Sequence, residues 1–193
     1  MKKIIAKAAA IALVLIVLAG CGANSSGWLR DEVANYLHST DFVITQQVGT
    51  QEGGTYVLVK YENEGQEWLD QLTTYKKFPG RREISTSNRG ILVDPRISPG
   101  LTLGTGFPGW TETDGKIEDN WTLLGYSNSV DNGTVEMLLN DNTTVTGKVV
   151  SGTFILPFNV SRTEGSLSEP EIQELRILVN GQVVETWPNA TFQ

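Results

Sequence analysis

The alternation of apolar and polar residues is clearest in the C-terminal half, where it predicts a series of short β-strands. The segment 134–139 alternates Thr134, Glu136 and Leu138 with the apolar Val135, Met137 and Leu139. This alternation is typical of a strand with one face toward a core. Asn180-Gly181 is a two-residue turn of the kind that closes a β-hairpin, because both positions accept a positive φ. The predicted strands are 121–126, 134–139, 143–150, 153–158, 174–179 and 182–187.

The N-terminal half mixes one helical pattern with further strands. Residues 28–39 place Leu29, Val33, Tyr36 and Leu37 on one helical face, with Ser26 as the cap and with Asp31 and Glu32 in the first turn. Residues 42–44 and 56–61 are rich in β-branched and aromatic side chains and predict a hairpin around Gly53-Gly54. Residues 67–77 fit either a helix or a strand. We favour a strand, because an isolated hairpin needs a third partner to be stable.

The middle of the chain is rich in glycine and proline. Pro95, Pro99 and Pro108 with five glycines between residues 90 and 110 predict irregular structure. We interpret residues 97–120 as a connecting loop. It either covers the fold or exposes Phe107 and Trp110 for binding.

These patterns predict a mainly β fold with a short N-terminal helix, and an α+β fold is the alternative. We expect an antiparallel sheet in the N-terminal part and a β-sandwich or partial barrel in the C-terminal part. The predicted segments are 1–21 as signal peptide, 22–27 as tether, 28–96 as helix plus strands, 97–120 as loop and 121–193 as sandwich-like module.

The first 21 residues carry a signal for export. Lys2, Lys3 and Lys7 precede an unbroken apolar run of eleven residues at 8–18, which is too short to span a membrane. The run ends in Leu18-Ala19-Gly20-Cys21, which resembles the lipobox of bacterial lipoproteins. The resemblance implies that the Cys21 thiol receives a diacylglyceryl group and that Cys21 becomes the mature N-terminus. Two acyl chains would anchor the chain stably at the extracytoplasmic face of the cell membrane. The alternative is an ordinary secretory signal with an incidental cysteine.

The rest of the chain resembles uncharacterised small exported proteins and lipoproteins of Bacillus-type Gram-positive bacteria. This resemblance supports a lipoprotein in a Gram-positive envelope and implies neither a catalytic residue nor a substrate. The matching stretches are residues 56–61, Lys76-Lys77-Phe78-Pro79-Gly80, Gly125, residues 147–150 and residues 179–184.

The charge is strongly acidic and unevenly distributed. Three of the 15 basic residues and none of the 22 acidic residues precede Cys21, so the remainder has a net charge of −10. This balance excludes nucleic acid as an expected partner, because nucleic-acid affinity depends on neutralising phosphates. Basic residues gather only between 76 and 96. Lys76, Lys77, Arg81 and Arg82 are candidates for contact with an anionic surface, and the alternative is a solvated loop or strand edge.

Candidate catalytic residues are few. His38 is the single histidine and Cys21 the single cysteine, and no metal-binding motif or cofactor motif occurs, so we expect neither a metal nor a cofactor. Acidic residues between Trp110 and Trp121 could bind or hydrolyse a sugar, or belong to a polar loop. Together with the two aromatic residues they form the candidate binding loop: Phe107, Trp110, Glu112, Asp114, Glu118 and Asp119.

Three functions therefore remain open. The favoured one is a membrane-anchored envelope lipoprotein that acts as a non-catalytic binding or scaffolding module, with an envelope polymer or a protein as partner. The first alternative is an envelope glycan hydrolase that uses the acidic residues of 112–119. The second is a membrane-proximal regulator that contacts an anionic polymer through its basic residues.

Overall fold

The computed structural model describes residues 25–50, 54–77, 81–86, 90–93, 101–113, 116–162 and 170–188. The chain divides into a unit of residues 1–40 and a compact unit of residues 41–193. The described part has one short helix and two antiparallel sheets that form no closed barrel, which confirms the predicted mainly β class.

The helix of the first unit, α2, runs over Ser25–Leu37 and so begins before the predicted residue 28. Residues 25–27 are therefore helical instead of part of a tether, and Asp31 and Glu32 do not lie in the first turn, as we had expected. The helix ends where His38 adopts a φ of 52°, and the Ser39 N–H donates to the Ala34 carbonyl oxygen at 3.2 Å. This is the hydrogen bond of a Schellman cap, which explains the left-handed residue.

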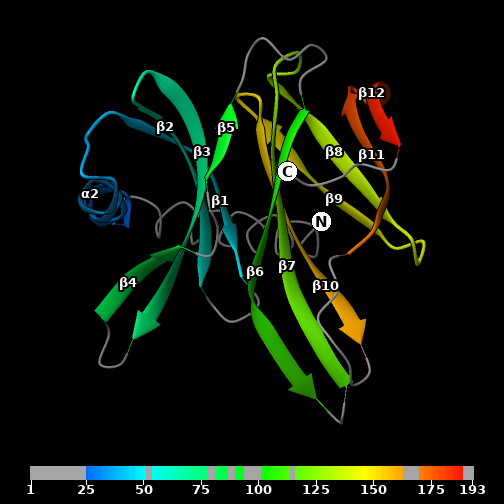
Figure 1. Cartoon of the computed structure of the whole chain (residues 1–193), viewed down its shortest axis with the longest axis horizontal. Helices are drawn as coiled ribbons and strands as arrows, with labels where there is room; N and C mark the ends of the chain where they lie inside the picture. The colour runs from blue at the N-terminus through cyan, green and yellow to red at the C-terminus, as the bar shows by residue number, and fades with distance from the viewer. Residues whose placement is uncertain are drawn as a thin grey trace, which may run out of the picture. The chain divides into compact units, whose positions relative to one another are not determined.

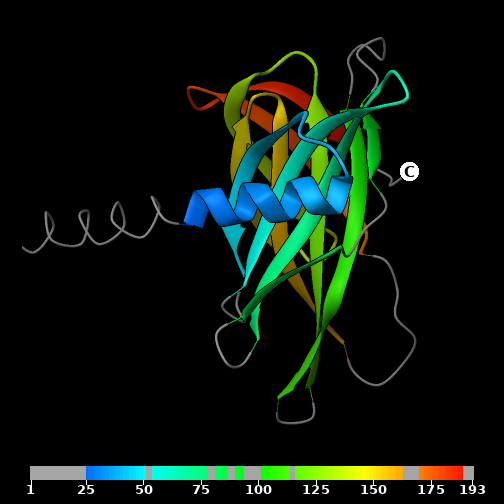
Figure 2. The same cartoon turned by 90° about the vertical axis from the view of Figure 1, so that its left-hand side faces the viewer.

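The second unit begins with a five-stranded antiparallel sheet, whose strands face the viewer in Figure 2. Its order is β1-β2-β3-β4, and β5 also pairs with β3. The predicted hairpin at 42–61 and the predicted strand at 67–77 are confirmed. The strands are β1 (Phe42–Gly49), β2 (Thr55–Asn63), β3 (Gln66–Lys77), β4 (Arg81–Thr86) and β5 (Ile91–Val93).

A seven-stranded antiparallel sheet follows, with the order β12-β11-β8-β9-β10-β7-β6. All six predicted C-terminal strands are present, and Asn180 and Gly181 have the expected positive φ values of 52° and 77°. The strands are β6 (Leu101–Thr113), β7 (Lys116–Ser127), β8 (Asn132–Leu139), β9 (Thr144–Val150), β10 (Thr153–Arg162), β11 (Ile172–Val179) and β12 (Gln182–Pro188).

The prediction of a loop at 97–120 was wrong, because β6 and the first part of β7 occupy most of it. β6 is the last strand of its sheet, and its pairing register with β7 shifts between Gly106 and Gly109. Pro108 lies within this irregularity. A bulge on an edge strand tolerates a proline that cannot donate a ladder hydrogen bond.

The seven-stranded sheet folds over on itself between β9 and β10. Among the described residues these two strands pair only at Val150 and Thr153. The β12-β11-β8-β9 half thereby faces the β10-β7-β6 half, and the two halves enclose one apolar core (Figure 1). This core includes Leu123, Met137, Phe154, Leu156 and Leu175, each fully buried.

The other face of β7 and β10 packs on the five-stranded sheet. Leu124 and Ile155 point away from the first core and form a second core with Leu58 and Leu69. The Thr122 hydroxyl on the same face donates to the Gln71 side-chain oxygen at 2.6 Å. The β7–β10 pair is therefore the middle of three layers in the second unit (Figure 1).

The outward face of the five-stranded sheet carries a buried carboxyl group. Asp70 on β3 alternates with Leu69 and Gln71, so its side chain points away from the seven-stranded sheet. It is 6% exposed, and its Oδ1 has no hydrogen-bond partner among the described residues. Burial raises the pKa of Asp70 to about 6, although hydrogen bonds from the Gln71 backbone and the Tyr61 hydroxyl lower it part of the way back.

The raised pKa of Asp70 predicts a pH-dependent loss of folding stability, and Asp70→Asn should remove this loss. Since the folded state holds this proton more tightly than the unfolded state, the contribution of Asp70 to stability falls as pH rises from about 4 to about 6. Above pH 6 the variant should be more stable than the wild type by roughly 2–3 kcal/mol, and below pH 4 the difference should vanish. Urea unfolding at pH 3.5, 5 and 7.5 measures this difference. A constant difference across these pH values would contradict the assignment.

Candidate functional site

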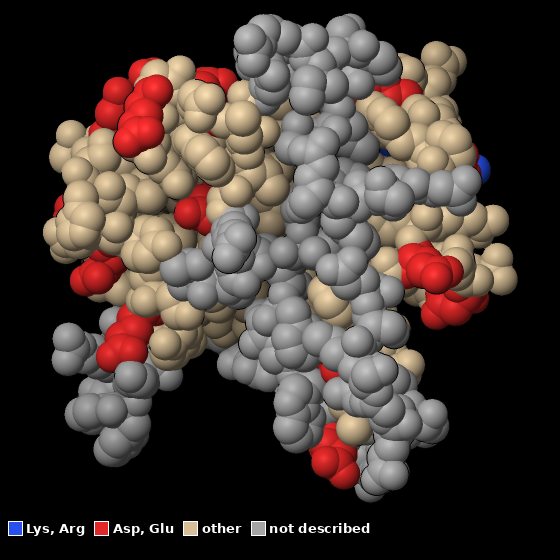
Figure 3. Space-filling view, in the orientation of Figure 1, with Lys and Arg blue, Asp and Glu red and all other residues tan. Residues whose placement is uncertain are grey.

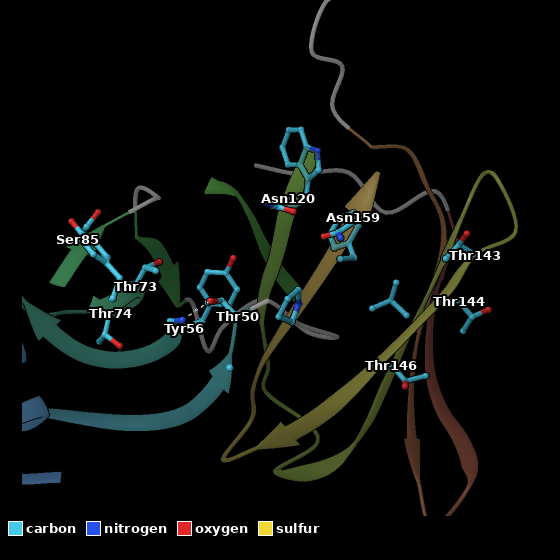
Figure 4. Close-up of a pocket in the computed structure, with 17 residues that line it drawn as sticks. Thr50, Tyr56, Thr73, Thr74, Ser85, Asn120, Thr143, Thr144, Thr146 and Asn159 are labelled. Carbon is cyan, nitrogen blue, oxygen red and sulfur yellow. Dashed lines mark hydrogen bonds between the residues drawn. The ribbon is translucent and has the colours of Figure 1, made fainter. Parts of the chain in front are cut away.

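A pocket of about 640 Å³ opens in the second unit, beside the place where β9 and β10 separate. Its residues come from all three layers: from β1 to β4 on one side, from β7 and β10 in the middle, and from the start of β9 on the other side (Figure 4). Its volume lies in the range of ~300–1,000 Å³ that is usual for small-molecule sites.

Most of the described residues that line the pocket carry a hydroxyl or an amide group, and aromatic and aliphatic side chains complete its wall. None of the described residues that line it carries a charge, and none is a histidine or a cysteine. The lining side chains that can form hydrogen bonds and are labelled in Figure 4 are Thr50, Tyr56, Thr73, Thr74, Ser85, Asn120, Thr143, Thr144, Thr146 and Asn159.

The β9–β10 turn determines which edge of β10 borders the pocket. Ser151 and Gly152 have φ values of 51° and 75°, as in a two-residue hairpin of type I′. The closing pair of such a turn is hydrogen-bonded, so the N–H and C=O of Thr153 point toward β9. Because this direction alternates along a strand, the backbone groups of Pro157 point the same way.

The two strands separate beyond this turn, and β10 presents an edge there. The side chain of Gln46 on β1 donates to the carbonyl oxygens of Lys148 and Thr153, close to the turn that joins β9 and β10. Pro157 lies farther along the same edge and lines the pocket. Its missing N–H costs no ladder hydrogen bond, since β10 is paired there only with β7 among the described residues.

One polar group in the wall is buried without a partner. The Thr73 side-chain oxygen is inaccessible to solvent and has no hydrogen-bond partner among the described residues. Thr73 lies on β3, beside Thr74 and near the exposed ring of Tyr75, which is 38% exposed. An unsatisfied hydroxyl costs about 1–3 kcal/mol, so a ligand that pairs with it recovers part of that cost.

The described residues that line this pocket do not include the described members of the predicted acidic set, which are Glu112, Glu118 and Asp119. Glu118 and Asp119 are consecutive on β7, so their side chains point to opposite faces of the sheet. Asp119 is 2% exposed, whereas Glu112 on β6 is exposed. Phe107 and Trp110 lie on β6 at and beside its bulge, and Asp114 lies outside the described residues.

The basic candidates form two cross-strand pairs next to the β3–β4 turn. In the register of this hairpin Lys76 is opposite Arg82, and Lys77 is opposite Arg81. Like charges directly opposite one another destabilise a sheet. Elsewhere on the described surface, acidic side chains are spread over several regions in the view of Figure 3.

The predicted lipidation site lies outside the described residues, as do Leu18, Ala19, Gly20 and Cys21. In the part of the chain that the structure describes, no helix is long and apolar enough to cross a membrane. The same part contains no group of three or more side chains placed to hold a metal ion.

Comparison with protein-family models, with curated proteins and with solved structures gave no match. The function must therefore be argued from the geometry of this chain.

Sequence reasoning missed the pocket, although two signals for it were present. Thr73-Thr74 and the run Thr143-Thr144-Val145-Thr146 place clustered hydroxyls on strands. Pro157 interrupts an otherwise apolar strand pattern, which indicates a strand edge. What the sequence does not give is the three-layer arrangement that brings these stretches to one cavity.

Proposed function

We propose that this protein is a lipid-anchored envelope protein that binds its ligand in the pocket beside β10 and does not turn it over. Cys21 holds it at the extracytoplasmic face of the membrane, through the lipobox-like Leu18-Ala19-Gly20-Cys21 and the export signal before it. The ligand is a component of the surrounding envelope.

The chemistry of the pocket wall carries this proposal. General acid–base catalysis most often uses a histidine, a carboxylate, an amine or a thiol, and nucleophilic catalysis needs a nucleophile with such a base beside it. The described lining offers hydroxyls, amides and aromatic rings instead. Those groups position a ligand by hydrogen bonding and packing, as expected of a binding module. The hydrolase alternative has less support, because Glu118 and Asp119 point to opposite faces of β7.

Lipidation predicts a mature protein that begins at a modified Cys21. Mass spectrometry of the protein extracted from membranes should find an N-terminal peptide with a thioether-linked diacylglyceryl group. Cys21→Ala should leave the precursor unprocessed and without the lipid. A wild-type N-terminal peptide that lacks any acyl group would contradict the anchor.

Ligand binding in the pocket predicts that a bulky side chain there abolishes association with the envelope. Asn120 on β7 shares the face of Thr122, which is turned toward the five-stranded sheet, and it lines the pocket. Because Asn120 is partly exposed, Asn120→Trp should fill part of the cavity with little effect on folding. Co-sedimentation of protein lacking residues 1–21 with purified Gram-positive cell wall should fall at least ~10-fold, which corresponds to about 1.4 kcal/mol.

Asn132→Trp is the matched control, because Asn132 is an exposed asparagine at the start of β8 and is not among the described residues that line the pocket. It should bind as the wild type does. Equal binding by both variants would refute the pocket as the site, and soluble wall fragments released by the wild type would refute a purely binding role.

The opposed cations of the β3–β4 hairpin favour a second candidate function, contact with an anionic surface near the anchor. The register pairs Lys76 with Arg82 and Lys77 with Arg81, which places four cationic residues at the turn end of the hairpin. An anionic polymer or lipid headgroup would meet several cations there.

This candidate predicts salt-sensitive binding to anionic vesicles. At low salt each cation contributes roughly 1 kcal/mol, so Lys76→Gln with Lys77→Gln should weaken the binding of protein lacking residues 1–21 by about 30-fold. Lys148→Gln with Arg176→Gln removes two exposed charges elsewhere and should have little effect. No binding to phosphatidylglycerol vesicles at 20 mM salt would eliminate this function.

A further inference from the structure

We infer that the pocket beside β10 recognises an uncharged saccharide chain. This inference rests on the proposed binding function and names the ligand class for the same site. Three features of the pocket support it: its hydrogen-bonding groups, the absence of charge among its described lining residues, and the edge that borders it.

The hydrogen-bonding groups match a ligand rich in hydroxyls. Threonine and serine hydroxyls both donate and accept, as sugar hydroxyls do, so the two sets can pair in either sense. The buried Thr73 oxygen needs a partner from outside the described protein, and the Asn120 amide adds both a donor and an acceptor. The exposed ring of Tyr75 offers a flat apolar surface for the C–H face of a sugar ring.

The absence of charge disfavours ionic ligands. A phosphate or carboxylate that leaves water needs a cation or several strong donors to replace its hydration. None of the described lining residues is cationic. A cationic ligand likewise finds no carboxylate in the described wall.

The edge of β10 disfavours an extended peptide, which is the other ligand that such a cavity could accept. A peptide that adds to a sheet edge gains its affinity from main-chain hydrogen bonds. Pro157 removes a donor from this edge inside the pocket, and prolines on edges are a common protection against strand addition. A ligand that depends on side-chain hydroxyls is not affected by this missing donor.

Isothermal titration of the full-length protein in detergent micelles tests the inference. The probes are chitotetraose and cellotetraose, which are uncharged, tetragalacturonate, which is anionic, fully deacetylated chitotetraose, which is cationic, and a neutral Ser/Thr/Ala decapeptide. At least one uncharged saccharide should bind, and the charged saccharides and the peptide should bind at least ~10-fold more weakly.

Isosteric variants locate the binding. Thr73→Val and Ser85→Ala each remove one hydroxyl from directly opposed positions on β3 and β4, and each should weaken saccharide binding by roughly 2- to 10-fold, the range for one neutral hydrogen bond. Thr186→Val, an exposed threonine on β12 that does not line the pocket, should change nothing. Circular dichroism melting of each variant separates a loss of binding from a loss of folding.

Two outcomes would overturn the inference. One is saccharide binding that both pocket variants leave unchanged. The other is a failure of every uncharged saccharide to bind while the anionic, cationic or peptide probe does. If cell-wall co-sedimentation then remains sensitive to Asn120→Trp, the ligand class is wrong and the binding function stands. If that sensitivity is also missing, the binding function fails as well.

Discussion

Burial of both faces of the β7–β10 pair is the constraint on which the rest of the second unit depends. Leu123, Phe154 and Leu156 pack into one core, while Leu124 and Ile155 on the same strands pack into another. Each fully buried side chain of this size contributes about 1.5–3 kcal/mol. Gly125 is part of the fit, because a Cβ atom there would come within 2.3 Å of the Phe154 ring.

The same constraint accounts for the pocket. A strand pair that is covered on both faces leaves only its edges accessible, and β7 has β6 on one edge and β10 on the other. β9 pairs with β10 only at Val150 among the described residues and diverges from it toward Thr144, so the outer edge of β10 is left beside a cavity. The pocket therefore exists because the seven-stranded sheet supplies two of the three layers. The described part of its wall is uncharged in a chain with a net charge of −7, which is consistent with a site that selects by hydroxyl and amide contacts.

The sequence predicts the strands well and their arrangement poorly. Two features are local and can be recognised from a short stretch of sequence. They are the Asn180-Gly181 turn and the alternation at Val135, Met137 and Leu139. The runs at 121–126 and 153–158 are apolar on both faces, which is the sign of a strand covered on both sides, but the covering strands are far away in sequence. The glycine-rich stretch of β6 was misinterpreted, because low strand propensity was outweighed by its long pairing with β7.

The candidate sites show the same contrast between local sequence features and contacts between distant stretches. Lipidation at Cys21 depends on a contiguous motif and can be proposed from sequence alone. The pocket depends on residues more than 100 positions apart, such as Thr50 and Asn159, and no local pattern joins them. The acidic residues at 112–119 are close in sequence, but strand alternation places Glu118 and Asp119 on opposite faces.

Native-state hydrogen exchange tests most directly whether the β7–β10 pair unites both sheets. If it does, amides of Leu58 and Leu69 in the five-stranded sheet should exchange with the same free energy of opening as those of Leu123 and Leu156, through global unfolding. Amides of the edge strand β12, such as that of Val183, should open at lower cost. Exchange of β2 and β3 in a separate step of clearly lower free energy, with β7 and β10 still protected, would contradict the account.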